Sequence, residues 1–449
     1  MKLACLVASV MGASAMVDVA HGQTSEALMD ALVRKGILTE QEAEDIKADL
    51  ARENAAVNNV RAPGKNTAGI ELSGDFRGRF ENFTADDDSF TTRNRWRYRL
   101  RVQAEAEFYE RFEVGLRLAS GEGAFDDVDA APLGGDPISG NQTFNNNASG
   151  KDLWVDKAYA TWRALETLDS SGSLTFGKMS NPFVFSPLVF DSDYTPEGLA
   201  TSWSHAFNDE HMLGFAAGGF VLDEISGDSD DPYMLGAQLR FDSIWSYNEA
   251  HKPKLSTSAG VAVLSISNEE MLTNVAVPNG QQGNSRTPAG VLDSNFNPFV
   301  LDGTITYYFD SAPLYNGFFP VSLVGNYINN PAARSDDDGY SIGIQLGKAG
   351  KKATWSLAYE WRHLGRDAWY EEIVDSDFGA LYTAAFPGGR TGYRPGTNIE
   401  GHIVTANYSP YNALTLGVTW FYTHLIDEPA GSTGDGLMSR LQVDAMLKF

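Results

Sequence analysis

The chain has a single cysteine, Cys5, among 449 residues, and it lies in an N-terminal segment that resembles a removable leader. The mature protein is therefore expected to have no disulfide and no thiol chemistry. Histidine is also scarce, with seven residues, and no H-E-x-x-H or comparable ligand spacing occurs. The close pair His205 and His211 flanks the short segment FNDEH. No metal site is expected from this pattern.

Several motifs that mark enzymes are missing as well. The sequence has no G-x-S-x-G, no G-x-x-x-x-G-K-[ST], and no G-x-G-x-x-G that opens a helix. A barrel-embedded lipase would need a serine and a histidine close together at the lipid-facing surface, and no such spacing stands out. We therefore predict that the protein is not an enzyme and has no cofactor.

Positive charge is in short supply, since 34 lysine and arginine residues face 59 aspartate and glutamate residues, for a net charge of -25. This balance argues against nucleic acid as a partner, because phosphate binding needs a basic face. No apolar run after the N-terminus is long enough for a transmembrane helix. With 44 glycines and 43% hydrophobic residues, the chain is not disordered either. A soluble β protein and a membrane β-barrel remain.

The N-terminus has the layout of a secretory signal, with Lys2, an apolar core from Leu3 and small residues before Ala15 and Gly22. We predict a signal peptide over residues 1–22, with cleavage after Ala15 or Gly22; a buried helix is the alternative. Residues 23–66 are expected to form a short periplasmic α-helical segment and linker. Thr39 and Glu42 there form a capping box. The helices form either a hairpin packed on itself or an oligomerising coiled coil.

From residue 67 to residue 449, period-2 alternation replaces the helical pattern. The stretch 93–108, RNRWRYRLRVQAEAEF, separates four arginines from Trp96, Tyr98, Leu100 and Val102, as a strand with one cationic and one apolar face does. Comparable runs give about sixteen antiparallel strands, an even number as outer-membrane barrels require. They lie near residues 70–81, 93–108, 112–118, 152–163, 172–179, 198–207, 211–223, 231–243, 254–267, 297–309, 318–330, 338–348, 352–365, 398–410, 412–427 and 436–449.

The links between these strands alternate in length. Short links occur at 109–110, 208–210, 349–351 and 411, and long polar links occur near 120–151, 180–197, 268–296 and 366–397. In an outer-membrane barrel, short turns lie at the periplasmic rim and long loops lie outside.

Three features favour a membrane barrel over a half-buried soluble sheet. Many runs reach the 9 to 11 residues, approximately, that a tilted strand needs to cross a bilayer. Aromatic residues gather near strand ends, as in Tyr307-Tyr308-Phe309 and Trp420-Phe421-Tyr422, where girdles belong. The chain also ends on LQVDAMLKF, and a last strand that stops on Phe449 resembles the C-terminal signal of bacterial outer-membrane barrels.

In a barrel the arginines must face the lumen. One arginine turned to lipid at mid-depth costs roughly 2–4 kcal/mol, so four would cost on the order of 8–16 kcal/mol, comparable to the stability of a whole domain. The predicted cationic wall comprises Arg77, Arg79, Arg95, Arg97, Arg99 and Arg101, interspersed with Glu71, Asp75 and Glu81. The wall either filters anions or is a solvated surface whose charges balance one another. An inward-folded loop would oppose it with Asp191, Asp193 and Glu197.

Three segments carry a resemblance to a known family. WVDKAYATW (154–162), TFGKMSNPF (175–183) and LVFDSDYTPEGLA (188–200) resemble a family of bacterial outer-membrane porins akin to the phosphate-selective porins. LVRKGILTEQEAEDIK (32–47) ahead of a barrel is similar to the same group. The resemblance implies a water-filled pore, a homotrimer and a third external loop that constricts the channel. It does not identify the solute.

The sequence therefore predicts an outer-membrane porin through which small hydrophilic solutes and ions diffuse, with outer-membrane lipid and lipopolysaccharide as its surroundings. The alternatives are a closed adhesive or structural barrel that anchors the envelope and a soluble secreted β protein. Three acidic clusters, at residues 86–88, 227–231 and 335–339, fall in expected external loops. They are either solvated or bound to divalent ions such as Ca²⁺, which could bridge them to lipopolysaccharide.

Overall fold

The computed structural model describes residues 69–86, 90–109, 111–123, 134–227, 229–249, 251–273, 277–379, 396–428 and 437–449. The predicted signal peptide and helical segment lie outside these residues. The chain divides into two compact units, and the fold described below belongs to the larger, Leu72–Ala104 with Val114–Phe449. Among the residues described, no helix is both long and apolar enough to cross a membrane, a finding that does not bear on β-barrels.

The structure is built almost entirely from strands. They are β1 (Ile70–Ala85), β2 (Arg93–Phe108), β3 (Phe112–Ser120), β4 (Gln142–Thr143), β5 (Leu153–Glu166), β6 (Ser170–Lys178), β7 (Glu197–Ala206), β8 (His211–Val221), β9 (Tyr233–Tyr247), β10 (Pro253–Ser267), β11 (Phe299–Phe309), β12 (Phe319–Asn329), β13 (Asp338–Gly347), β14 (Thr354–Leu364), β15 (Ile399–Tyr411), β16 (Leu414–Leu425) and β17 (Met438–Lys448). Two single turns of 3₁₀-helix, η1 (Asn146–Ala148) and η2 (Glu269–Met271), lie in the links.

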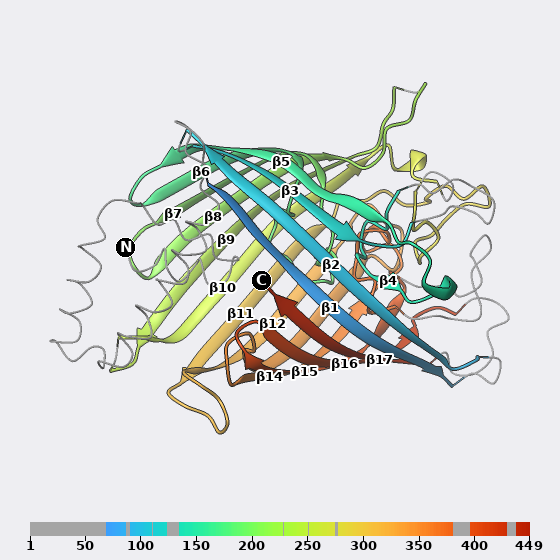
Figure 1. Cartoon of the computed structure of the whole chain (residues 1–449). Coiled ribbons are helices and arrows are strands. Elements are labelled where there is room, and N and C mark those ends of the chain that lie inside the picture. The colour runs from blue at the N-terminus through green and yellow to red at the C-terminus, as the bar shows by residue number, and fades with distance from the viewer. Residues whose placement is uncertain are drawn as a thin grey trace. The chain divides into compact units, whose positions relative to one another are not determined.

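All the strands belong to one sheet, which closes into a barrel because β1 pairs with both β2 and β17 (Figure 1). The two-residue β4 belongs to the long link between β3 and β5 and adds only a short pairing with β2. The barrel wall therefore has sixteen strands, and the predicted antiparallel barrel is confirmed.

The barrel closes where the end of the chain meets the first strand. Gly74 and Phe449 exchange backbone hydrogen bonds of 2.8 and 3.1 Å. A β-carbon at residue 74 would lie 2.4 Å from the carbonyl oxygen of Arg101 and 2.6 Å from the Phe449 ring. Only glycine fits between these neighbours, because any side chain would collide with backbone on β2.

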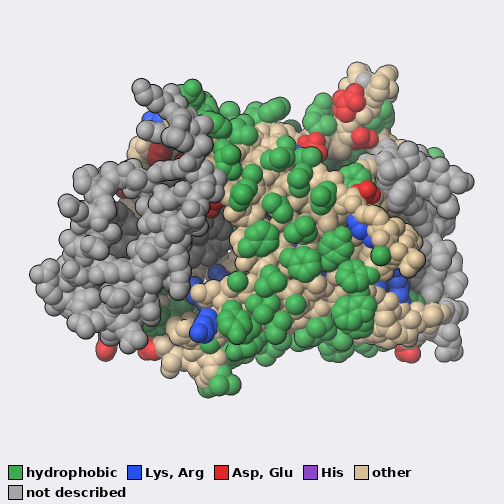
Figure 2. All heavy atoms as spheres, viewed as in Figure 1, with side chains coloured by type: hydrophobic (Ala, Val, Ile, Leu, Met, Phe, Trp, Pro, Cys, Tyr) green, Lys and Arg blue, Asp and Glu red, His purple; other side chains and the backbone are tan. Residues whose placement is uncertain are grey.

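Alternate residues of each strand face opposite sides of the wall. On β2, Trp96 is 59% exposed and Val102 is 40% exposed, whereas Arg97 and Arg99 are 6% and 4% exposed. Hydrophobic side chains lie across the outer face of the barrel (Figure 2). They include Leu301, Ile305, Leu323, Ile342, Ile344, Leu357 and Val418. An apolar outer band of this kind suits the hydrocarbon of a bilayer.

The apolar core of the barrel unit lies inside the wall and is supplied largely by loops. Three links contribute large buried side chains to one cluster: Phe183, Leu188 and Phe190 from the β6–β7 link, Leu272 and Phe296 from the β10–β11 link, and Trp369, Tyr370 and Ile373 from the β14–β15 link. The sequence predicted an inward fold for the first of these loops only. We call the described parts of these links, residues 179–196, 268–273 with 277–298, and 365–379 with 396–398, the inner loop cluster.

Candidate functional site

Seven arginines from three adjacent strands converge on the inner face of the barrel. Arg77 and Arg79 come from β1, Arg440 comes from β17, and β2 supplies Arg95, Arg97, Arg99 and Arg101. Sequence reasoning missed Arg440. The alternation of Arg440, Gln442 and Asp444 along the last strand could have revealed it, because closing a barrel brings the last strand beside the first.

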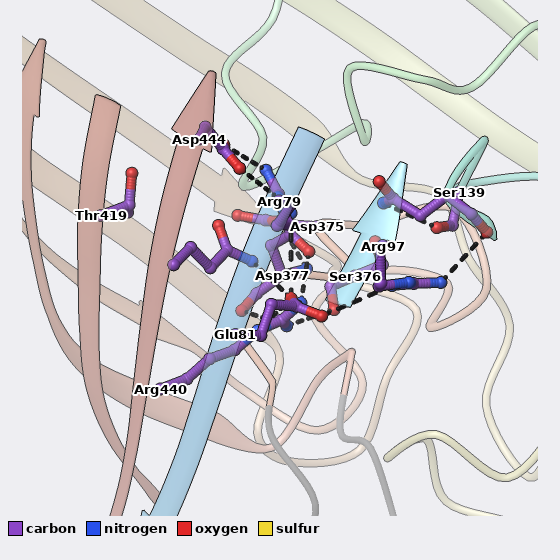
Figure 3. Close-up of polar contacts among 12 residues, drawn as sticks. Arg79, Glu81, Arg97, Ser139, Asp375, Ser376, Asp377, Thr419, Arg440 and Asp444 are labelled. Carbon is purple, nitrogen blue, oxygen red and sulfur yellow. Dashed lines mark hydrogen bonds and ion pairs between the residues drawn. The ribbon is translucent and has the colours of Figure 1, made fainter. Parts of the chain in front are cut away.

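Glu81 is the centre of this arginine group. Its side chain is fully buried and accepts hydrogen bonds from Arg440 Nη2 at 2.5 Å, from Gln442 Nε2 at 3.0 Å and from Arg95 Nε. Arg97 and Arg79 lie 3.8 and 3.9 Å away. Figure 3 shows Glu81 and Arg440 between β1 and β17, with Arg97 on the neighbouring strand. Several donors share this one carboxylate, and such a network holds the buried charged side chains in fixed positions.

Asp377, from the β14–β15 loop, bonds to the same wall. It accepts a hydrogen bond from Arg79 Nη1 at 2.8 Å and another from Arg440 Nη2 at 2.7 Å (Figure 3). Burial raises the pKa of Asp377, but Arg79 and Arg440 outweigh this effect and hold the pKa well below its usual range. Asp377 was not predicted, because its position depends on how a long loop folds.

Asp193, from the β6–β7 loop, meets the other end of the arginine row. Arg99 Nη1 donates to both of its carboxylate oxygens, at 2.8 and 3.0 Å, and Arg101 Nη1 donates at 3.1 Å. Asp75 on β1 holds the same two arginines at 3.0 and 2.7 Å. Burial raises the pKa of Asp193, but Arg99 and then Arg101 lower it further, so the carboxyl stays ionised.

Asp191 and Glu197, the other two acids predicted to oppose the arginines, lie elsewhere. Asp191 is buried and accepts hydrogen bonds from the backbone N–H of Asp193 at 2.7 Å and of Ser376 at 3.0 Å. Burial, followed by the charges of Asp193 and Asp375, raises its pKa well above the usual range. Glu197 begins β7, is largely exposed and pairs with Lys178 at 2.9 Å.

The β6–β7 loop reaches two distant parts of the wall. Near its start, Val184 exchanges hydrogen bonds of 2.9 and 2.8 Å with the Gln238 side chain on β9, and its carbonyl also accepts from Arg240 at 3.1 Å. Near its end, Asp193 bonds to β2. In the strand order, β9 lies roughly half-way round the barrel from β1. The loop therefore crosses the interior and is tied down at both ends.

Polar contacts join the loops of the inner loop cluster to one another. Glu371 accepts hydrogen bonds from the backbone N–H of Gln281 at 2.8 Å, from that of Asn284 at 2.6 Å and from Arg286 Nη2 at 2.5 Å. Trp369, fully buried, donates from Nε1 to the carbonyl of Val189 at 2.9 Å. These bonds and the shared apolar cluster make the three loops one packed unit.

A small cavity of about 50 Å³ remains between the arginine wall and the loops. Arg95, Arg97 and Arg440 line its wall side, and Ser139, Ser376 and Asp377 lie on its loop side.

Within the described part of the chain, no group of three or more histidine, cysteine, aspartate or glutamate side chains is arranged to hold a metal ion.

Part of this barrel matches a known protein family. Residues 79–270 match a family described as "Putative porin". This segment is similar to a family of porins. The predicted resemblance to outer-membrane porins is therefore confirmed. No curated protein matches the chain.

Several solved structures are similar to this chain, and the first described here shows the same fold. OprB of Pseudomonas putida is 12% identical, with a TM-score of 0.50 over 85% of this chain and 94% of that chain. A triple mutant of Rhodopseudomonas blastica porin is 9% identical, with a TM-score of 0.40 over 85% of this chain and all (100%) of the other. A loop L8 deletion mutant of Vibrio cholerae OmpT is 10% identical, with a TM-score of 0.42 over 85% and 99%. The family match and the barrel point to a channel protein of the outer membrane rather than an enzyme.

Proposed function

We propose that this protein is a porin that forms a water-filled channel across the outer membrane and passes small hydrophilic solutes and ions by diffusion. The arginines of β1, β2 and β17 line the channel on one side, and Asp193 and Asp377 of the inward loops face them. Solutes are selected by the width left between loop and wall and by the field across it.

One observation carries this proposal: Arg99 and Arg101, on the inner face of the wall, bond directly to Asp193 of a loop that crosses the interior. A cationic wall opposed by a carboxylate-bearing loop gives a transverse field where the passage is narrowest. Asp191 serves as a positioning residue, since it holds the backbone of Asp193 and Ser376. The contacts of Glu197 give it no part in this constriction.

The proposed orientation places the short links and the N-terminal segment in the periplasm and the long loops outside the cell. It follows from the usual asymmetry of outer-membrane barrels, whose periplasmic turns are short. The signal peptide at residues 1–22 would direct export, lipid and lipopolysaccharide would surround the barrel, and the working assembly would be a homotrimer.

The test is the conductance of the refolded mature protein in a planar bilayer. Discrete, stable current steps are expected for the wild type. The reversal potential in a salt gradient should shift towards lower anion preference in an Arg95/Arg97/Arg99/Arg101→Ser variant. Current steps with an unchanged reversal potential would leave the channel in place and reject the arginine wall as its selectivity element.

A second candidate is a closed structural barrel, and one observation favours it. The inner loop cluster contains a continuous apolar core, with Trp369, Leu272 and Phe296 fully buried. Loops that only narrow a channel need no such core. A bilayer that stays silent with correctly folded protein would support this candidate and reject the porin.

A further inference from the structure

The β11–β12 link, residues 310–318, folds against the outer face of the barrel at the end that carries the short links. Phe319 starts β12 on the outer side of the wall, the same side as Leu323, which is 50% exposed. Phe319 is nevertheless only 8% exposed, because the rings of Tyr315 and Trp355 each lie 5.0 Å from its ring, measured between centroids. Figure 1 shows the link as a loop that projects beside β11 and β12. The link therefore covers part of the outer face.

Hydrogen bonds hold this link in place. The indole of Trp355 donates from Nε1 to the carbonyl of Pro313 at 3.1 Å. The Tyr315 hydroxyl donates to the carbonyl of Lys348 at 3.0 Å and accepts from the backbone N–H of the same residue at 3.3 Å. A β-carbon at Gly347 would lie 2.3 Å from the carbonyl oxygen of Trp355, and its φ is +70°, so glycine is needed where β13 ends. The β11–β12 and β13–β14 links thus form one fixed surface.

Leu314 is the tip of the β11–β12 link. Its side chain is 91% exposed, and its φ of 57° lies in the left-handed region that bulky residues rarely adopt. Phe318, in the same link, is 38% exposed. A large apolar side chain that is both exposed and held in a costly backbone conformation indicates a surface that meets a partner.

Lysine side chains flank this link on both sides. β10 pairs with β11 and β13 pairs with β12, so the β9–β10 and β13–β14 links lie to either side of it. The three links contain two acids, Glu249 and Asp310, whereas the whole chain has a net charge of -25. Among the described residues, neither Lys351 nor Lys352 forms an ion pair. The β9–β10 link, the start of β10 and the β13–β14 link present five exposed lysines: Lys252, Lys254, Lys348, Lys351 and Lys352.

The β5–β6 link, residues 167–169, provides a comparison, because it lies at the same end of the antiparallel barrel. Its Leu168 is 97% exposed. The charged residues beside this leucine are Glu166 and Asp169, and the link contains no lysine. An exposed leucine is thus common to both links, but of the two only the β11–β12 link has lysines beside it.

We propose that the β11–β12 link and the lysines beside it bind an anionic phospholipid of the inner leaflet of the outer membrane. Lys351 and Lys352 hold the phosphodiester, since clusters of lysine next to a membrane attract anionic headgroups. Leu314 and Phe318 enter the zone between headgroups and acyl chains, and Trp355, with a polar N–H on an apolar ring, suits the same zone. The inference rests on the proposed function, which places the short links at the periplasmic rim.

The test is the melting temperature of the folded, detergent-solubilised mature protein titrated with phosphatidylglycerol, which is anionic, and with phosphatidylcholine, which has no net charge. Phosphatidylglycerol should stabilise the wild type more strongly, because a ligand that binds only the folded state raises its melting temperature. In Lys351→Gln/Lys352→Gln the apparent affinity for phosphatidylglycerol should fall roughly tenfold or more. Added salt should weaken the preference of the wild type, since the lysines are exposed.

Two matched controls separate the site from general effects. Lys151→Gln/Lys448→Gln removes the same charge from the β3–β5 link and from β17 and should keep the preference for phosphatidylglycerol. Leu314→Gln should lower the affinity for phosphatidylglycerol, whereas Leu168→Gln, at a comparably exposed leucine without lysine neighbours in its link, should not. Heat-modifiable migration on a gel checks that each variant is folded.

Equal stabilisation of the wild type by the two lipids, or an unchanged affinity in the lysine variant, would reject the lipid site. A changed oligomeric state in Leu314→Gln with unchanged lipid affinity would show that a second copy occupies the link, and would reject the site too. Conductance distinguishes this inference from the proposed function. A silent bilayer with the lipid preference intact rejects the porin alone, whereas a conducting channel that does not discriminate between the lipids rejects the lipid site alone.

Discussion

Arg99 donates two hydrogen bonds from one guanidinium nitrogen to Asp193, at 2.8 and 3.0 Å, across 94 positions of sequence. The first residue is fixed by a strand of the wall and the second by a loop that crosses the interior. Both side chains are largely buried, at 5% and 14% exposure. This contact and the hydrogen bond from Arg101 to Asp193 hold the loop against the wall, so we expect that breaking them changes what passes.

Asp193→Asn should release the β6–β7 loop from the arginine wall. Removing one partner of a buried ion pair costs about 3–5 kcal/mol, because the other charge remains buried; Asp75 still contacts Arg99 and Arg101, so we expect the lower end. Single-channel conductance should rise and the melting temperature should fall. Glu197→Gln, which removes an exposed acid paired only at the surface with Lys178, is the control and should change neither.

Trp369→Ala should loosen the inner loop cluster without unfolding the barrel. The indole is fully buried among Phe190 and Phe296, and its loss should cost the cluster about 3–5 kcal/mol. Protease cleavage of the loops and the conductance should increase, while heat-modifiable migration on a gel, which reports the barrel, stays as in the wild type. Leu314→Ala, at a residue 91% exposed, is the control. Loss of the folded barrel in Trp369→Ala would contradict the separation of loops and wall.

Glu372 should make the inner loop cluster sensitive to pH. Burial raises the pKa of Glu372 from near 4.5 to about 7, while hydrogen bonds from the Asn279 backbone and the Tyr370 hydroxyl oppose the rise. The folded state therefore favours the protonated acid. This contribution is complete below a pH of about 4.5 and is lost as the pH rises through about 7.

The measurement is the melting temperature of the wild type and of Glu372→Gln between roughly pH 5 and pH 8. One pKa unit corresponds to about 1.4 kcal/mol, so the wild type should lose on the order of 3 kcal/mol relative to the variant over this range. Burial also raises the pKa of Asp191, so its contribution to stability falls with rising pH as well. Asp191 is present in both proteins, however, and its contribution cancels in the difference. Parallel curves would show that Glu372 does not titrate in this window.

Val418→Arg and Thr419→Arg test which face of the wall meets lipid. The two residues are neighbours on β16, but Val418 is 42% exposed on the outer face and Thr419 lies on the inner face beside Thr405. An arginine towards lipid costs about 2–4 kcal/mol at mid-depth. Refolding into vesicles should therefore fail or slow for Val418→Arg and proceed for Thr419→Arg. The opposite order would invert the assignment of faces.

Much of the wall could be predicted from the sequence because alternate residues of a strand face opposite sides of the sheet. The run from Arg93 to Phe108 separates arginine from apolar residues, and the structure places Arg97 inside and Trp96 outside. The same rule assigned sixteen strands and the positions of the long and short links. Two of the acids interspersed among these arginines, Asp75 and Glu81, pair with arginines of the neighbouring strand in the structure.

Only part of the candidate site could be predicted from the sequence in this way. Asp193 was selected together with Asp191 and Glu197, since all three are acids in or next to one loop, yet only Asp193 contacts arginine. Asp377 was missed because it lies 298 positions from its partner Arg79, and no periodicity relates a loop residue to a strand so far away. Arg440 was missed because the alternation of residues along one strand does not show that the last strand pairs with the first.

The sequence by itself determined the alternation of polar and apolar residues, and with it the strands, the two faces of the wall and the side to which its arginines turn. These properties are local, because each depends on the residue and its immediate neighbours along one strand. Only the tertiary structure decided which carboxylate meets which arginine and that three loops share one interior core. These depend on contacts between segments distant in the chain, whose geometry is set by barrel closure and loop packing together.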